Sequence, residues 1–269
     1  MPLELQNRDL EIFKFVFENR IATYQQIYRR FFYGKVKSLV SRRLCKLTDV
    51  GYFNQSCLRD KNKVHICFHP NEKLFQEIRR CYNFYIDQPH FKTESPFHDI
   101  SLIEIRQRLE NLVSFKNYFS ENLLDSSLEL QNEFQLNKNL NLHPDGILHL
   151  VNPQGSELVC AIEYEGSRKS LKRYTEKITK YYKLHLLHYV LYICKNKSIQ
   201  KLVEEANYLN NPMSDAFVLT ALEKDVFNDK AQIIFSSRGE QILNLSLNQN
   251  HVLHPPQNRP VNGLQPDSS

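Results

Sequence analysis

Residues 23–52 read TYQQIYRRFFYGKVKSLVSRRLCKLTDVGY, and this stretch decides the fold of the N-terminal part. Thr23 has the side chain of a helix N-cap, and apolar residues then recur at helical spacing, so residues 24–32 are predicted to form a helix. A second apolar stripe predicts a helix over residues 35–50 that ends at Gly51. The residues of this stripe, expected to face inward, are Val36, Leu39, Val40, Leu44 and Leu47.

The flanking segments complete a small domain. Residues 7–19 have the apolar spacing of another helix. After Gly51, residues 52–57 and the alternating residues 64–69 are predicted to pair as a hairpin around the charged turn at residues 58–63. Three helices followed by a hairpin with a basic tip resemble the winged helix-turn-helix family, which implies a third helix that enters the major groove of DNA.

The charge of the chain is concentrated at this end. Residues 1–60 carry 11 Lys and Arg against 6 Asp and Glu, while the rest of the chain is neutral. Such a surplus is typical of a site for a polyanion, so we expect double-stranded DNA as the partner. A winged helix used for protein contacts remains the alternative. The expected DNA contacts on the helix and hairpin are Lys35, Lys37, Ser38, Ser41, Arg42, Arg43, Lys46, Lys61 and Lys63.

A possible metal motif lies in the hairpin. His65, Cys67 and His69 would share one face of a strand, with Cys57 on the neighbouring strand. A zinc site there is one interpretation, although the spacing is not that of a known zinc motif. The six cysteines show no CxxC pairing and indicate reduced thiols of a cytoplasmic protein.

The chain is predicted to contain two domains, which gives an α/β (α+β) fold class. The winged helix-turn-helix occupies residues 1–70, residues 71–96 connect, residues 97–246 form a mixed-sheet domain, and residues 247–269 form a disordered tail. Strands are expected at residues 114–119, 132–136, 146–151, 158–164, 186–194, 216–222 and 231–235. Helices are expected from Asp99 as cap to residue 111, over residues 168–184, and from Ser198 as cap to residue 209.

Three acids stand at hydrophobic strands of the second domain. Asp145 begins one strand, and Glu163 and Glu165 are two positions apart on the next, so both face the same side. Carboxylates have little reason to enter a core unless they pair with cations or bind a metal. Together they predict a site for Mg²⁺ or Mn²⁺, which polarises a phosphodiester and lowers the pKa of a water.

These motifs resemble the restriction-endonuclease-like fold, whose pattern is Pro-Asp, a gap, and then acid-x-Lys on the next strand. Pro144-Asp145 and Glu163-Tyr-Glu165 match, except that Glu165 stands where Lys is usual. The missing cation is expected from the following basic helix, and the candidates there are Lys169, Lys172 and Lys177. The outward cations Arg168, Lys169 and Lys172 are also expected to contact the phosphate backbone.

A closer resemblance covers both domains, from about Leu10 to Phe235. The order of motifs is similar to the replication-relaxation family, which includes MOB-C-type relaxases of mobilisable plasmids. This resemblance implies nicking or relaxation of an origin of transfer or replication with a divalent metal, alongside other relaxosome or mobilisation proteins. The residues that it implies for the site are His98, Glu104, Asp145, Glu163, Glu165, Lys177 and Tyr181.

Two alternatives stay open. In the first alternative, Glu163 and Glu165 form surface ion pairs with Arg168, Lys169 and Lys172. The chain is then a noncatalytic DNA-binding accessory protein or a repressor of a mobile element. The other alternative is a restriction-type defence endonuclease. Other classes are excluded by missing motifs: no His-hydrophobe-His pair, no phosphate-binding glycine loop, no Gly-x-Ser-x-Gly and no apolar stretch of membrane-span length are present.

Overall fold

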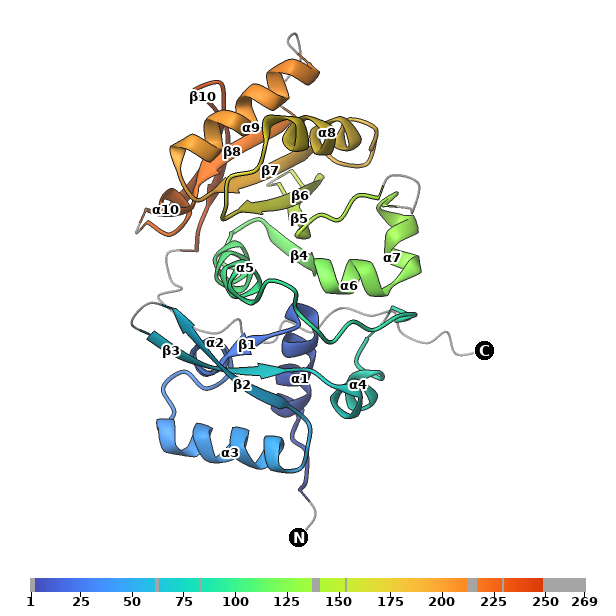
Figure 1. Cartoon of the computed structure of the whole chain (residues 1–269), viewed down its shortest axis with the longest axis vertical. Helices are drawn as coiled ribbons and strands as arrows, with labels where there is room; N and C mark the ends of the chain where they lie inside the picture. Colours follow the sequence, from blue (N-terminus) through green and yellow to red (C-terminus); the bar gives the residue numbers. More distant parts are fainter. Residues whose placement is uncertain are drawn as a thin grey trace.

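The computed structural model describes residues 3–60, 63–82, 84–136, 141–152, 154–211, 217–228 and 230–248. These residues form a mixed α+β fold with two sheets, a three-stranded one in the order β1-β3-β2 and a seven-stranded one in the order β10-β9-β8-β7-β6-β5-β4. Figure 1 shows the small sheet with the N-terminal helices below and the large sheet above. Among the described segments, no helix is long and apolar enough to cross a membrane.

Hydrogen bonds at the ends of the helices position the elements of the N-terminal region. It contains α1 (Asn7–Asn19), β1 (Ala22–Thr23), α2 (Tyr24–Phe31), α3 (Lys37–Asp49), β2 (Asn54–Asp60), β3 (Lys63–His69) and α4 (Glu72–Ile78). Thr23 and Gln26 form the capping box that starts α2. The hydroxyls of Tyr24 and Tyr28 donate to the carbonyls of Lys37 and Lys35, which fixes α2 against the start of α3.

The prediction of which α3 residues face the core was partly wrong. Val40, Leu44 and Leu47 are buried, but Val36 is 63% and Leu39 52% exposed. The reason is that α3 begins at Lys37, so Val36 is its N-cap and the first turn projects beyond the core. The outer face of α3 therefore carries apolar as well as basic side chains.

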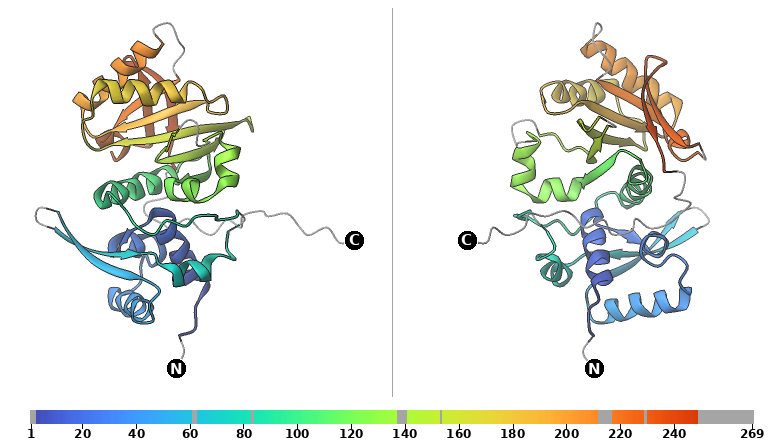
Figure 2. Two further views of the ribbon diagram at one scale, coloured as in Figure 1. Left: turned by 45° about the vertical axis from the view of Figure 1, so that its right-hand side comes forward. Right: turned by 180° about the vertical axis from the view of Figure 1, so that it is seen from behind.

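The second region is a three-layer arrangement. It contains α5 (Pro96–Leu109), β4 (Phe115–Ser120), α6 (Glu121–Ser126), α7 (Leu128–Glu133), β5 (Gly146–Val151), β6 (Glu157–Glu165), α8 (Leu171–Tyr181), β7 (Tyr189–Cys194), α9 (Lys197–Asn210), β8 (Val218–Leu222), α10 (Glu223–Val226), β9 (Gln232–Ser237) and β10 (Glu240–Ser246). Strands β4, β5 and β6 are antiparallel neighbours. Strands β6, β7 and β8 are parallel to one another, and α8 and α9 connect them. Figure 2 shows α8 and α9 on one face of this sheet, and α5 packs on the other face.

Several predicted boundaries were wrong. The strand expected at residues 132–136 is the end of α7 and its following turn, because Ser127 caps a helix there. Helix α5 begins after Ser95 with Pro96 at its first turn, and α9 is capped by Asn196, so neither Asp99 nor Ser198 is the cap. β10 was not expected at all.

The tail begins later than expected. Leu247 is buried and bridges to Leu112, and the amide of Asn248 donates to the carbonyl of Asn111. Those two residues therefore belong to the fold, while the remainder of the expected tail, residues 249–269, lies outside the described residues.

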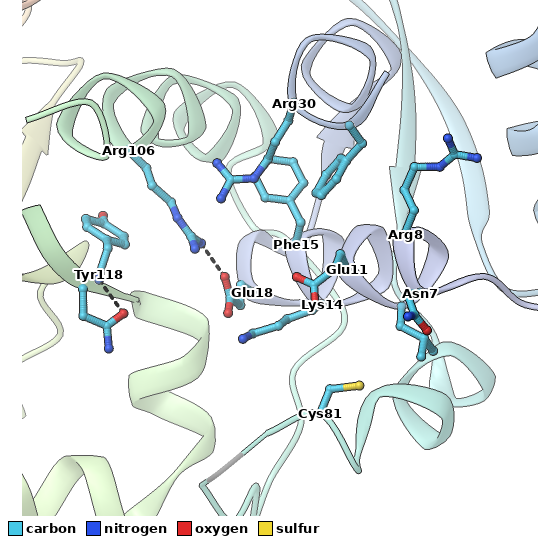
Figure 3. A pocket seen from close by; sticks show the side chains of 13 residues that line it. Asn7, Arg8, Glu11, Lys14, Phe15, Glu18, Arg30, Cys81, Arg106 and Tyr118 are labelled. Atoms are coloured by element: carbon cyan, nitrogen blue, oxygen red, sulfur yellow. Dashed lines mark hydrogen bonds and ion pairs between the residues drawn. The ribbon is translucent and has the colours of Figure 1, made fainter. Parts of the chain in front are cut away.

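Buried ion pairs join the two regions. Arg106 on α5 contacts Glu18 on α1 at 2.6 Å and Glu110 at 2.8 Å, and Glu110 is also bound by Arg30 of α2. A cavity of about 650 Å³ opens beside these residues, between α1, α2, α5 and β4. Figure 3 shows the pair of Arg106 and Glu18 at this junction.

The expected connector is also packed. Ile86 is buried, and the amide of Asp87 donates to the carbonyl of Ser126 in α6. A single cluster of buried apolar residues runs from α1 through α6 to α8 and α9. The two regions thus share a core in this structure.

Candidate nuclease-like site

The site forms where β5 and β6 meet. Their antiparallel register pairs Gly146 with Ile162, which places Asp145 opposite Glu163. Oδ2 of Asp145 accepts a hydrogen bond from the amide of Tyr164 at 2.6 Å. Of the three acids predicted to converge on one sheet face, the register thus brings Asp145 and Glu163 opposite each other, where β5 begins beside β6.

Glycine follows Asp145 for a steric reason. A Cβ on Gly146 would lie 2.2 Å from the hydroxyl oxygen of Tyr118, whose ring is buried beneath the strand. That hydroxyl donates to the carbonyl of Asp145 at 3.3 Å. The Pro-Asp-Gly sequence thus lets Tyr118 support the backbone that carries the carboxylate.

Glu163 is buried and receives two partners from α8. Lys177 Nζ lies 2.6 Å from its Oε2, and the hydroxyl of Tyr181 donates to its Oε1. Lys177 and Tyr181 are four residues apart, so they share one face of the helix. Burial raises the pKa of Glu163 to about 7, although Lys177 acts in the opposite direction. For Lys177, burial lowers the pKa but Glu163 and Asp145 outweigh it, so the ammonium is retained.

Glu165 is held separately from the other two acids. Lys169 Nζ lies 2.8 Å from its Oε1, and the hydroxyl of Tyr174 donates to Oε2 at 3.4 Å. Tyr192 on β7 pairs with Glu163 in the register, and its buried hydroxyl has no hydrogen-bond partner among the described residues. The α8 face of the sheet therefore concentrates two carboxylates and three tyrosines.

His98 approaches Asp145 from the other side. It lies in the first turn of α5, and its Nε2 is 3.2 Å from Oδ1 of Asp145. Burial lowers the pKa of His98, but the hydrogen bond and charge of Asp145 outweigh it and raise the pKa above its ordinary value. Burial likewise raises the pKa of Asp145, and the contact with His98 reverses that effect and lowers it.

Glu104 does not join this group. It accepts hydrogen bonds from Arg29 and from Gln26 of α2, so it lies at the junction of the two regions. Of the residues expected for the site, His98 contacts Asp145, and both Lys177 and Tyr181 contact Glu163, which lies opposite Asp145 in the register. Glu165 lies two residues further along β6.

Asp145 and Glu163 fit a divalent cation by their chemistry. Mg²⁺ is usually held in proteins through one or two carboxylates and several waters, and two carboxylates meet here. No three His, Cys, Asp or Glu side chains in the described part of the chain form a metal-binding group. The expected ligand set of Asp145, Glu163 and Glu165 is therefore not assembled in the described residues, where Lys177 engages Glu163 and Lys169 engages Glu165.

The histidines of the β2–β3 hairpin do not form a metal-binding group among the described residues either. In the register Cys57 faces Ile66, so it lies on the opposite face from His65, Cys67 and His69. His69 contacts the hydroxyl of Ser56 at 2.7 Å. The alternative of a zinc site at this hairpin was wrong for the residues that the structure describes.

The outer face of α3 presents most of the expected DNA contacts. Arg43 is an exception, because its guanidinium binds the fully buried carboxylate of Asp9 and the carbonyl of Glu4. Lys61 lies outside the described residues. The expected contacts of this region that are exposed are Lys35, Lys37, Ser38, Ser41, Arg42, Lys46 and Lys63.

The cations around α8 have different environments. Arg168 is exposed, and the side chain of Lys172 is 86% exposed and lies 3.9 Å from that of Glu176, which is 61% exposed. Lys169 is engaged by Glu165. Two residues beside Asp145 were missed by the sequence analysis, Arg20 and Glu121, since no spacing relates them to the acids.

A comparison of the chain with protein-family models, with curated proteins and with solved structures finds no match.

Proposed function

We propose that this chain binds duplex DNA through an N-terminal winged helix-turn-helix and nicks it at a restriction-endonuclease-like site with Mg²⁺ or Mn²⁺. The observation that carries the proposal is the meeting of Asp145, Glu163 and Lys177 in a unit with the order α5-β4-α6-α7-β5-β6-α8-β7. Asp145 and Glu163 lie on neighbouring strands, which is the placement that the resemblance to restriction endonucleases implies. Lys177 supplies from the helix the cation that the strand motif lacks.

The N-terminal region supports the DNA-binding part of this proposal. Helices α1 to α3 are followed by the β2–β3 hairpin, and the outer face of α3 carries exposed Lys37, Arg42 and Lys46. Exposed Val36 and Leu39 on the same helix suit contact with thymine methyl groups in a major groove. Phosphates would bind the cations and base edges would specify the site.

The residues of the site have separable roles in this mechanism. Asp145 and Glu163 would hold the cation, which when bound polarises the phosphodiester and lowers the pKa of a water. Lys177 keeps its charge and places an ammonium beside Glu163, where it orients a phosphate oxygen or the attacking water. His98 holds Asp145 from the α5 side and, with a raised pKa, provides a proton donor close to the carboxylate.

The biological setting follows from the resemblance to the replication-relaxation family. We infer processing of a plasmid or mobile-element origin in the cytoplasm, together with other relaxosome or mobilisation proteins. A second candidate is a noncatalytic DNA-binding accessory protein or repressor. It is favoured by one observation, namely that Glu163 and Glu165 already have cationic partners in Lys177 and Lys169.

A nicking assay on supercoiled plasmid tests the proposal. With Mn²⁺, the wild type is expected to produce an open circle, and Asp145→Asn and Lys177→Ala are expected to lose about a hundredfold or more of the rate. Matched controls on and just after α8 are Glu176→Gln and Lys183→Ala, which remove exposed charges. A linear product instead of an open circle would support a restriction-type enzyme. No nicking, with no Mn²⁺-dependent change in melting temperature, would leave the accessory DNA binder.

A further inference from the structure

Arg20 has a backbone conformation that arginine rarely adopts. It ends α1 at φ 59° and ψ −13°, in the left-handed region, where glycine or asparagine is the usual residue. An L-residue is disfavoured there because its Cβ lies too close to the following carbonyl oxygen. Such an outlier is a reason to ask what the side chain does.

The guanidinium of Arg20 lies between two carboxylates of the second region. It binds Glu121 at the start of α6, and its Nε is 3.6 Å from Oδ2 of Asp99 on α5. The Arg20 side chain is 17% exposed and that of Asp99 6%. Burial lowers the pKa of Arg20, but Glu121 and Asp99 more than compensate, so this is a charged and largely buried link.

The two residues that carry these carboxylates, Glu121 and Asp99, are both close to contacts of Asp145. The amide of Glu121 donates to the carbonyl of Asp145 at 3.2 Å. Asp99 follows His98, whose ring contacts the carboxylate of Asp145 at 3.2 Å. Arg20, Asp99, Glu121 and Asp145 also line one small cavity. Arg20 therefore binds Glu121, whose amide contacts the backbone of Asp145, and Asp99, which is next to the His98 that contacts the side chain of Asp145.

The end of α1 is docked at the same place. The hydroxyl of Ser120 donates to the carbonyl of Glu18, and the side-chain amide of Asn122 donates to the carbonyl of Phe17, both at 2.6 Å. The last turn of a helix lacks backbone donors for its carbonyls, so these bonds stabilise the end of α1, where the carbonyl of Phe17 also accepts from the backbone amide of Arg20. The start of α6, and with it Glu121, is thus tied to the N-terminal region.

We propose that Arg20 is a positioning residue for the candidate site, through which the DNA-binding region orders the carboxylate of Asp145. Without its guanidinium, buried Asp99 and half-buried Glu121 would be like charges next to Asp145, and they would repel one another and that carboxylate. The part of this proposal that concerns catalysis rests on the proposed nicking function. The part that concerns the position of Asp145 does not.

The amide of Tyr164 reports the position of Asp145 directly, because it donates to Oδ2 at 2.6 Å. We would compare its proton chemical shift by NMR in the full-length wild type, Arg20→Gly and Arg29→Ala. Glycine suits the left-handed conformation, so Arg20→Gly is expected to fold. Arg29→Ala is the matched control, because it removes another arginine that crosses the junction, to Glu104.

The expected result is an upfield shift of the Tyr164 amide proton in Arg20→Gly, partial return in Arg20→Lys, and no shift in Arg29→Ala. An unchanged Tyr164 amide in Arg20→Gly would overturn the proposal. An equal shift in Arg29→Ala would also overturn it, since any loosening of the junction would then suffice. If Arg20→Gly fails to fold, Arg20→Gln removes the charge at nearly constant length and is measured in the same way.

Activity provides the second readout. Single-turnover nicking of supercoiled plasmid with Mn²⁺ is expected to slow about tenfold or more in Arg20→Gly, while affinity for a labelled random-sequence duplex stays unchanged. Arg20→Lys should recover part of the rate. A fall in duplex affinity equal to the fall in rate would contradict a positioning role. A shifted Tyr164 amide without nicking in any variant would refute the nuclease function and leave the positioning role standing.

Discussion

The cations of α3 and the carboxylates of the β5–β6 edge are two charged groups of opposite character. On α3, Lys37, Arg42 and Lys46 project into solvent. At the sheet edge, Glu163 and Glu165 are each 1% exposed, and each has a lysine and a tyrosine as partners. The first group is open to an external partner, whereas the second is already organised inside the protein.

The difference matters for what a substitution does. An exposed cation contributes little to folding, so its removal changes mainly what the protein binds. A buried charge has left water at a high cost, so its removal or the removal of its partner changes the free energy of unfolding. Stability and binding measurements therefore separate the two groups.

The largest effect is expected at the junction of the two regions. Glu110 is bound by Arg30 and Arg106, and Glu110→Ala leaves two cations without this carboxylate in a buried setting. The free energy of unfolding in urea is expected to fall by about 3–5 kcal/mol. The control is Lys116→Ala, which breaks a pair whose side chains are 45% and 51% exposed and should change nothing measurable. Equal effects of the two substitutions would remove the distinction between buried and exposed charges.

The site acids are expected to affect stability with opposite signs. The pKa of Glu163 is raised from 4.5 to about 7, so its contribution to stability is complete below pH 4.5 and is lost as the pH rises to about 7. The unfolding free energy of the wild type minus that of Glu163→Gln should therefore fall by about 3 kcal/mol over this range. If this difference in unfolding free energy did not change with pH, the charge of Lys177 would fully compensate the effect of burial on the pKa of Glu163.

Asp145 is the counterpart in the same experiment. Its pKa is lowered, so it stabilises the fold above its ordinary pKa of 3.8 and loses that contribution only in more acidic solution. The unfolding free energy of the wild type minus that of Asp145→Asn is expected to fall as the pH drops below 3.8, whereas the same difference for Glu163→Gln rises as the pH drops from about 7 to 4.5. Urea unfolding of the wild type and both variants without metal, at a series of pH values, provides the measurement, and pH dependences of the same sign would contradict the assignment.

The smallest effect is expected on α3, where neighbouring arginines differ. Arg42 is exposed, and Arg42→Ala with Lys46→Ala should weaken duplex binding about tenfold and reduce its salt dependence. Arg43→Ala should instead lower the melting temperature, because the buried carboxylate of Asp9 loses its cation. Fluorescence anisotropy and thermal melting distinguish the two. If Arg43→Ala weakened binding as strongly as the Arg42 pair at unchanged stability, the contact with Asp9 would not persist in solution.

Local patterns predicted much of the fold. The bounds of α1 (Asn7–Asn19) and β5 (Gly146–Val151) agree with the predicted ones, because α1 has apolar residues at helical spacing and β5 is a short, almost entirely buried apolar run. The prediction failed where the decisive contact was distant. Residues 132–136 have strand-like content but follow the Ser127 cap, and Leu39 has the spacing of a core residue but nothing packs over it.

The site shows the same limit. Acids two apart on a strand, followed by a basic helix, are a local arrangement, so Asp145, Glu163 and Lys177 were all predicted. Arg43 was expected at DNA because its partner Asp9 lies 34 residues away in the sequence. Arg20 was missed altogether, since its contact with Glu121 crosses 101 residues and no periodicity reveals it.

The ion pairs between α1, α2 and α5 have a mechanical consequence. Hinges form where few contacts cross a boundary, whereas here Glu18, Arg30 and Arg106 bridge it from inside a shared core. Such a bridged frame favours a fixed offset between the outer face of α3 and the carboxylate of Asp145. Under the proposed function, the duplex and not the protein would adapt to that offset, and sequences that deform easily would fit it best.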